Sequence, residues 1–460
     1  MPLILGTNSI KDTGYDVDNS CRFNDGDSPY MTKTPGSDGN RQTFTLSVWL
    51  KRGTLGSAQN ILGSSDSNFG NGLFFQFQSD DTFRFGFQDP NQFKATNRVF
   101  RDISAWYNII VAVDVNQASN SDRVKIYING TQETSFATDN TMTDADKGWN
   151  NQQAHSVGRS GAHDNQYFDG YLAEVVSIDG SQLTASSFGE FDENSPTIWK
   201  PKDVSGLTFG TNGFYLDFKD SGNLGNDANG GTDLTENNLA ATDQSTDSPT
   251  NNFATWNPLD SHRSYSGTID LSEGNLRQSN GNDATLISTI ALNSGKWYME
   301  FKCEDADNTR TFGIIDITES NGYVGHSSVA SAVSYGYKSS DGTLWIGTSS
   351  QASSVGTTSA GDIVSIALDL DSATNSIKWQ KNGSDLSGTT ELSLTNHNTG
   401  YYWGIICRCD GGQVVSANFG SPAYAISSGN SDANGYGNFE YAVPSGYYAL
   451  CTKNLAEFGG

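Results

Sequence analysis

Apolar side chains recur at every second position along much of this chain, and this period constrains its fold more than any other feature. Between residues 43 and 50, the apolar members are Phe44, Leu46, Val48 and Leu50. Successive side chains of a strand point to opposite faces of a sheet, so the period predicts a half-buried β-strand. The same alternation returns at residues 73–77, 83–87, 107–115, 124–128, 213–219, 297–303 and 364–370.

Turn residues separate these runs, and two of the turns have the sequence of a tight hairpin. Asn129-Gly130 and Asn382-Gly383 suit a two-residue turn in which both central residues need positive φ. Closely spaced strands without a helical period favour antiparallel sheets packed face to face. One short helix is predicted, at residues 183–191 with Thr184 as its N-cap. We therefore expect an all-β chain.

Length and a local change in composition divide the chain. A chain of 460 residues is too long for one hydrophobic core. Residues 220–259 are rich in Asn, Asp, Gly and Thr, which predicts a polar linker whose far end is anchored by Phe253 and Trp256. We expect antiparallel β-sandwich (jelly-roll) domains at residues 1–219 and 260–425, and an irregular C-terminal strap at 426–460.

The charge of the chain argues against a nucleic-acid partner. Its 27 basic and 52 acidic residues give a net charge of -25, which would repel a phosphate backbone. The N-terminal residues, MPLILG, contain no basic segment and no long apolar run. We therefore expect neither a signal peptide nor membrane insertion, and cell lysis would be a sufficient route by which the protein leaves the cell.

The five cysteines lack the spacing of a metal site. Cys407 and Cys409 are separated by one residue, whereas paired zinc ligands are usually separated by two or more. On a strand, these two thiols would face the same side. We expect buried free thiols, with a disulfide as the alternative. The cysteines are Cys21, Cys303, Cys407, Cys409 and Cys451.

Both halves of the chain resemble known β-sandwich families. The first resembles a laminin G-like domain of the concanavalin A-like jelly-roll class, through SVWLKRG at 47–53, KIYINGT at 125–131 and SVGRSGAHDNQYFDGYLAEVVSIDG at 156–180. Residues 260–420 look like a SPRY domain, through SGKWYMEFK at 294–302, GDIVSIALDLD at 361–371 and IKWQKNG at 377–383. The resemblance implies two folds that commonly serve binding.

Three polar phrases carry a resemblance that spans nearly the whole chain. They are SCRFNDGDSPYMTKTPGSDGNR at 20–41, TDSPTNNFATWNPLD at 246–260 and YALCTKNL at 448–455. They are similar to recurring phrases in virion structural proteins of marine tailed bacteriophages. The resemblance implies a place on the virion surface, outside the cell after host lysis, with other virion proteins as partners. Such proteins occur on tail fibres and on capsids, so the position on the particle stays open.

The jelly-roll class includes laminarinase-like glycoside hydrolases, whose active strand carries acids at positions i, i+2 and i+4. The nearest match, EFDEN at 190–194, has its third acid at i+3 and reads as the end of a helix. These carboxylates would not share a face. The sequence also lacks Gly-x-Ser-x-Gly, Walker and His-Glu-x-x-His motifs. We expect a protein that is not an enzyme, with polysaccharide cleavage as the less favoured alternative.

Recognition of sugars by sandwich loops needs aromatic faces for stacking and polar groups that bind hydroxyls. In the first domain, the candidate glycan-binding residues are Trp149, Asn151, His163, Asp164, Asn165 and Tyr167. In the second domain, the candidate rim residues are Tyr323, His326, Tyr335 and Tyr337. Packing within a loop or core is the competing interpretation of each aromatic residue.

The laminin G-like resemblance also implies a calcium ion at the rim of the sandwich. Calcium prefers several carboxylate and carbonyl oxygen ligands. Candidate ligands are Asp66, Asn68 and Asp164, although Asp and Asn are also common turn formers in loops of this kind. No other cofactor is expected.

Two binding-type folds without a catalytic set predict a phage surface protein, a tail fibre or similar appendage, that binds host-surface glycans through its loops. Many copies on one particle would raise the avidity of weak sites, so we also expect a homo-oligomer. The alternative is a capsid decoration or cement protein with a structural role. The sequence has no heptad repeat of the kind that forms a fibre shaft, which keeps this alternative open.

Overall fold

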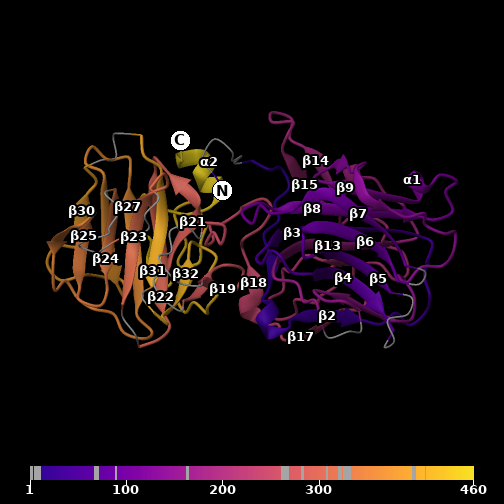
Figure 1. Cartoon of the computed structure of the whole chain (residues 1–460), viewed down its shortest axis with the longest axis horizontal. Helices are drawn as coiled ribbons and strands as arrows, with labels where there is room; N and C mark the ends of the chain where they lie inside the picture. The colour runs from indigo at the N-terminus through magenta and orange to yellow at the C-terminus, as the bar shows by residue number, and fades with distance from the viewer. Residues whose placement is uncertain are drawn as a thin grey trace. The chain divides into compact units, whose positions relative to one another are not determined.

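The computed structural model describes residues 4, 12–66, 72–88, 91–161, 165–260, 269–280, 284–306, 309–319, 324, 333–395, 400–409 and 411–459. The chain divides into an N-terminal unit at Thr13–Thr250 and a C-terminal unit at Asn251–Gly460, which also takes in Met1–Asp12. The regular structure of each unit is mainly β-strand, and nearly all the strand pairs are antiparallel (Figure 1). The all-β prediction is therefore confirmed. Among the described residues, no helix has the length and apolar character that a membrane crossing requires.

Two eight-stranded sheets form the N-terminal unit. The first has the order β10 (Thr131–Gln132), β9 (Val124–Ile128), β8 (Tyr107–Asp114), β3 (Thr43–Arg52), β13 (Gly170–Asp179), β1 (Ser20–Phe23) and β18 (Gln244–Ser245), with β16 (Phe214–Leu216) beside β13. The second has the order β11 (Phe136–Asp139), β7 (Gln92–Val99), β6 (Thr82–Phe87), β5 (Leu73–Phe77), β4 (Gln59–Ser65), β12 (Ala154–Val157), β2 (Tyr30–Lys33) and β17 (Thr235–Asn237). The short helix α1 spans Asn120–Arg123.

The core of the N-terminal unit contains the apolar members of the alternating strands. Phe44 and Leu46 from β3 and Phe75 and Phe85 from the second sheet are fully buried in one cluster. Burial of a side chain of this size stabilises the fold by about 1.5–3 kcal/mol. The alternation therefore identified the inward faces of both sheets correctly.

The segment expected to be a polar linker, residues 220–259, is instead built into the two units. Its strands β17 and β18 pair with β2 and β1, and the boundary between the units follows Thr250. Hydrogen bonds replace apolar burial here. Asp247 is 1% exposed, and its carboxylate binds Lys51 Nζ at 2.8 Å and Trp106 Nε1 at 3.0 Å. Paired polar groups can be buried, which composition alone did not indicate.

The predicted helix at residues 183–191 is also wrong. A single 3-10 turn at Ala185–Ser187 is followed by strand β14 (Gly189–Phe191), which pairs with β15 (Trp199–Pro201). Thr184 makes no side-chain capping bond. Lys200 forms ion pairs with Glu190 and Asp192, so cross-strand contacts outweigh the weak helical pattern.

The C-terminal unit contains a nine-stranded and a six-stranded sheet. The larger has the order β19 (Ile269–Ser272), β20 (Arg277–Asn280), β32 (Val414–Asn418), β22 (Lys296–Cys303), β27 (Ile363–Asp369), β28 (Ser376–Lys381) and β29 (Ser384–Asp385), with β30 (Glu391–Ser393) and β33 (Tyr448–Ala449) at its sides. The smaller has the order β21 (Ala284–Leu292), β31 (Trp403–Cys409), β23 (Arg310–Asp316), β24 (Ser334–Lys338), β25 (Thr343–Ile346) and β26 (Ser349–Ala352).

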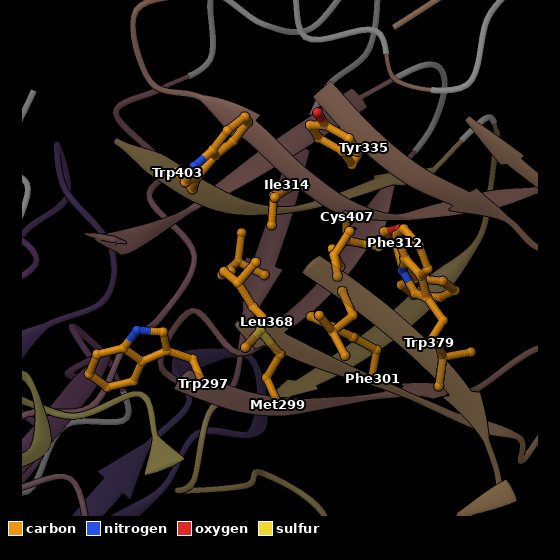
Figure 2. Close-up of a cluster of buried hydrophobic side chains, with 14 of the residues drawn as sticks. Trp297, Met299, Phe301, Phe312, Ile314, Tyr335, Leu368, Trp379, Trp403 and Cys407 are labelled. Atoms are coloured by element: carbon orange, nitrogen blue, oxygen red, sulfur yellow. The ribbon is translucent and has the colours of Figure 1, made fainter. Parts of the chain in front are cut away.

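Large aromatic side chains from both sheets fill the core of the C-terminal unit (Figure 2). Trp297 and Phe301 from β22 are fully buried, as are Trp379 from β28 and Trp403 from β31. Trp379 Nε1 donates to the carbonyl oxygen of Phe312 at 3.0 Å, which satisfies its polar atom inside the core. Phe253 and Trp256 are buried in this unit, so the anchors expected at the end of the polar segment are confirmed.

The C-terminal strap contains helix α2 (Thr452–Phe458) and is otherwise mostly irregular. A buried carboxylate on β22 holds it in place. Glu300 accepts hydrogen bonds from the backbone N–H groups of Glu440 at 2.9 Å and Tyr441 at 2.8 Å, and from Tyr298 Oη at 3.0 Å. Burial raises the pKa of Glu300.

Two local predictions are confirmed. Asn129 and Gly130 have φ values of 47° and 78°, and Asn382 and Gly383 have values of 50° and 72°, as the predicted hairpins require. All five cysteines are buried free thiols.

Candidate functional site

Trp149, expected to stack on a sugar ring, belongs instead to the core of the N-terminal unit. It is 1% exposed, and its Nε1 donates to Ser177 Oγ at 3.1 Å. Its ring also packs against His155, with centroids 4.4 Å apart. The sequence placed this residue in a loop but did not indicate that the loop folds inward.

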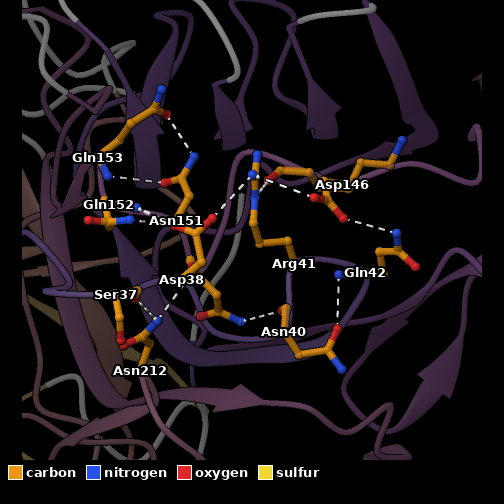
Figure 3. A network of polar contacts seen from close by, with 12 residues as sticks. Ser37, Asp38, Asn40, Arg41, Gln42, Asp146, Asn151, Gln152, Gln153 and Asn212 are labelled. Carbon is orange, nitrogen blue, oxygen red and sulfur yellow. Dashed lines mark hydrogen bonds and ion pairs between the residues drawn. The ribbon is translucent and has the colours of Figure 1, made fainter.

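Asn151 is likewise buried and lies in a network of polar contacts between two loops (Figure 3). Its Nδ2 donates to Gln153 Oε1 at 2.9 Å. Gln152 donates its backbone N–H and its Nε2 to Asp38 Oδ1, and Arg41 forms an ion pair with the same Asp38 at 3.4 Å. These side chains therefore satisfy one another and tie the loops together.

Tyr335 and Tyr337 are fully buried, which contradicts their predicted place on a binding rim. The ring of Tyr335 packs against Trp403, with centroids 5.6 Å apart, and Tyr337 Oη donates to the carbonyl oxygen of Gly356 at 2.8 Å. Both lie on β24, where their spacing of two residues places them on the inward face. The other two predicted rim residues, Tyr323 and His326, lie outside the described residues.

Of the three predicted calcium ligands, the structure describes one. Asn68, Asp164 and His163 lie outside the described residues, and Asp66 is half-buried just after β4. Within the described ranges, no three His, Cys, Asp or Glu side chains form a group that could hold a metal ion. A calcium site therefore stays a prediction.

A pocket with a volume of about 480 Å³ lies in the N-terminal unit. Strands β4, β5 and β6 contribute to its wall, and residues 158–161 and 165–166, here called the covering segments, contribute four further lining residues. The lining residues are Asn60, Ser64, Ser65, Leu73, Phe74, Gln76, Arg84, Gln88, Asn91, Ser160, Gly161, Asn165 and Gln166. Six amides, three hydroxyl groups and one guanidinium make this lining predominantly polar.

The alternation of the strands explains why polar side chains meet on this wall. Phe75 and Phe85 point into the core, so their neighbours point outward. The strand register then places Asn60 opposite Gln76, and Gln76 opposite Arg84, which gives a polar row across three strands. Gln76 is only 7% exposed, and its side-chain amide has no hydrogen-bond partner among the described residues.

Arg84 is the charged residue within the described part of the lining, and two aromatic rings restrict its position. Its guanidinium carbon lies 4.2 Å from the ring centroid of Phe74 and 3.8 Å from that of Phe93. Gly86 pairs with both phenylalanines across the sheet, where a Cβ atom would lie 2.5 Å from Phe93 Cβ. Burial lowers the pKa of Arg84, but arginine remains protonated at neutral pH.

The covering segments approach β4 closely because glycines face each other. A Cβ atom on Gly63 would lie 2.6 Å from the backbone nitrogen of Gly161. Asn60 donates its backbone N–H to the carbonyl oxygen of Gln166 at 2.8 Å, and its Nδ2 donates to Gln166 Oε1. Of the residues predicted from the sequence, exposed Asn165 lines this pocket and binds Ser160 Oγ at 2.6 Å.

Tyr167, another predicted residue, is half-buried and follows the covering segments along the chain. Its ring centroid lies 6.4 Å from that of Tyr30, whose ring is covered by the Arg159 guanidinium at 3.4 Å. Sequence reasoning missed Asn60, Gln76 and Arg84. The signal for them is the polar residues at the outward positions of strands rich in phenylalanine, whereas the sequence prediction for this domain named loop residues.

One family model matches a segment in the first half of the chain. Residues 25–187 match the family model of the concanavalin A-like lectin/glucanases superfamily, as the laminin G-like resemblance predicted. All the pocket residues fall within this range. No curated protein matches the chain significantly.

Several solved structures are similar to parts of the chain. The SPRY domain of human HERC1 has a TM-score of 0.28 and 13% identity, over 35% of this chain and 96% of that one. A protein from Bacteroides ovatus, described as carbohydrate binding, has a TM-score of 0.33 and 15% identity, over 48% and 59%. A SAP-like pentraxin from Limulus polyphemus has a TM-score of 0.28 and 16% identity, over 37% and 80%.

Proposed function

We propose that this chain binds carbohydrate without cleaving it, through the pocket on β4, β5 and β6. The observation that carries the proposal is the pocket's lining of six amides, three hydroxyl groups and one guanidinium, inside the range that matches a lectin-like family. Saccharides present many hydroxyl groups, and planar amide side chains donate to and accept from them. The ring of Phe74 adds an apolar surface to the same pocket.

Binding without catalysis is favoured by the chemistry of the lining. Most glycoside hydrolases use two carboxylic acids that flank the scissile bond. The lining residues that fall within the described ranges include neither Asp nor Glu. Elsewhere in the unit, Lys200 pairs with both Glu190 and Asp192, the acids nearest to a hydrolase pattern. Incubation with host envelope polysaccharide is expected to release no reducing sugar, and release would contradict the proposal.

The proposed setting is the surface of a virion, on a tail fibre or similar appendage that contacts the host. This part of the proposal is supported by the three polar phrases that resemble marine tailed-phage proteins. Antibody labelling of purified particles, viewed by electron microscopy, tests it. Label on appendages is expected, label over the capsid would favour the decoration alternative, and unlabelled particles would contradict both.

A glycan array probed with the full chain tests the carbohydrate-binding proposal, once as the free protein and once coupled to a multivalent carrier, because weak sites gain avidity from repetition. Gln76→Ala is expected to weaken binding at least tenfold, since Gln76 presents a free amide to the pocket. Gln117→Ala, which changes an exposed amide outside the pocket, is the control. Equal binding by both variants, or no binding by the multivalent protein, would contradict the proposal.

A further inference from the structure

The charge of the pocket differs from that of the chain as a whole. The chain has a net charge of -25, with 52 acidic residues against 27 basic ones. Among the described residues that line the pocket, Arg84 is the one charged side chain, and none is a carboxylate. A positive site enclosed by a polar wall attracts anions more strongly than an exposed charge does, because solvent screens it less.

Arg84 has hydrogen-bonding capacity that the protein does not use. Its Nη2 donates to Asn91 Oδ1 at 3.3 Å, and its Nε has no partner among the described residues. In that part of the chain it also forms no ion pair, whereas buried Arg52 and Arg22 are paired with Asp81 and Asp243. Arginine donors arranged in a fork match the two oxygens of a carboxylate.

A second feature of the wall also points to a ligand. Gln76 lies directly opposite Arg84 in the strand register. Its side chain is only 7% exposed, and its amide has no hydrogen-bond partner among the described residues. The amide atoms of Gln76 are not enclosed in the protein interior but face the pocket, where a ligand can donate to and accept from them. The amide and the guanidinium can therefore bind neighbouring groups of one ligand.

We infer that the pocket selects an acidic saccharide, whose carboxylate binds Arg84 and whose neighbouring hydroxyl binds Gln76. This inference rests on the proposed carbohydrate function and specifies its ligand class. The rings of Phe74 and Phe93 hold the guanidinium in place, so little conformational freedom is lost when the carboxylate binds. Removal of the charge from the sugar should therefore weaken binding more than a change of sugar stereochemistry elsewhere.

Calorimetry with matched saccharides tests the inference. The probes are oligomers of galacturonate, mannuronate and glucuronate, each compared with its carboxyl-reduced, neutral counterpart at fixed salt. At least one uronate is expected to bind the full chain ten times or more tightly than its neutral counterpart. Equal affinity for acidic and neutral members of every pair would overturn the inference but leave carbohydrate binding intact. Failure of every saccharide to bind would overturn both.

Variants of Arg84 assign the preference to that residue. Arg84→Gln is expected to weaken uronate binding at least tenfold and leave binding of the neutral counterpart unchanged. Arg84→Lys keeps the charge but loses the fork, so an intermediate loss is expected. Arg98→Gln removes the same charge from β7 at a half-exposed side chain outside the pocket and serves as the control. An equal loss for Arg84→Gln and Arg98→Gln, with unchanged melting temperatures, would contradict the assignment.

Discussion

Two buried side chains in the N-terminal unit respond to pH in opposite directions. Glu174 lies at a bulge of β13 with a φ of 48°, and Tyr215 Oη donates to its two carboxylate oxygens at 2.8 and 2.9 Å. Burial raises the pKa of Glu174 to about 7. His155 accepts the N–H of Asn150 at 3.0 Å, and burial lowers its pKa to about 4.

Glu174→Gln is expected to remove a loss of stability that occurs as pH rises. Below the ordinary pKa of 4.5, Glu174 is protonated in both the folded and the unfolded states. Between pH 4.5 and 7 the unfolded chain ionises first, so the free energy of unfolding falls by at most about 3 kcal/mol. Denaturant unfolding from pH 4 to 8 measures the difference between variant and wild type. A difference that does not change with pH would contradict this prediction.

His155→Gln is expected to remove a loss of stability that occurs as pH falls. Burial in the folded state favours the neutral imidazole. The contribution of His155 to the free energy of unfolding is therefore fully present above pH 6.5 and is lost as pH falls toward 4. The loss is at most about 3 kcal/mol. The glutamine keeps an acceptor for the Asn150 N–H. The same unfolding series checks the prediction. Because the pH ranges of Glu174 and His155 overlap and their effects have opposite signs, the free energy of unfolding of wild type should change less with pH than that of either variant.

At the scale of elements, the contact between β4 and the covering segments sets the shape of the pocket. Gly63→Ala would place a Cβ atom 2.6 Å from the nitrogen of Gly161 and 2.9 Å from the carbonyl oxygen of Arg159. The backbone must move, at a cost of about 1–3 kcal/mol. We expect a lower melting temperature and weaker saccharide binding. Gly36→Ala, which meets nothing within 4 Å, is the control, and identical behaviour of the two variants would contradict this account.

A second element-scale prediction concerns the C-terminal strap. Glu300→Ala leaves the N–H groups of Glu440 and Tyr441 without their acceptor, so the strap should loosen. The free energy of unfolding should fall by more than about 2 kcal/mol. Limited proteolysis is expected to cut the variant within residues 426–447 before wild type. Glu391→Ala, at an exposed position of β30, is the matched control. Resistance equal to that of wild type would show that the strap is held elsewhere.

Over the whole molecule, periodicity predicted the strands, both hairpins and the all-β class, because those features depend on local patterns. The aromatic residues outside the alternating runs were predicted less well. Trp149 and Tyr335 were predicted to contact a ligand but are buried in the structure. The polar phrase at 246–260 gave no sign that Asp247 and Asn252 are held by residues far along the chain, such as Lys51 and Thr452. Such long-range pairing cannot be read from composition.

The pocket itself depends on the same long-range information. Gln76 and Arg84 are near in sequence, but their meeting with Asn60 requires the register of β4 and β5, and Gln166 comes from a hundred residues further on. Only Asn165 was identified in advance among the lining residues. The sequence therefore predicted the class of fold, but the assembly of this pocket depends on strand register that the sequence did not show.

A crystal structure of the full chain with a bound oligosaccharide, chosen from the glycan array, tests the central claim most directly. The account predicts density between the covering segments and β4 to β6, within hydrogen-bonding distance of Gln76 and Arg84. Density confined to the loops around Asn151, or to the C-terminal unit, would contradict it.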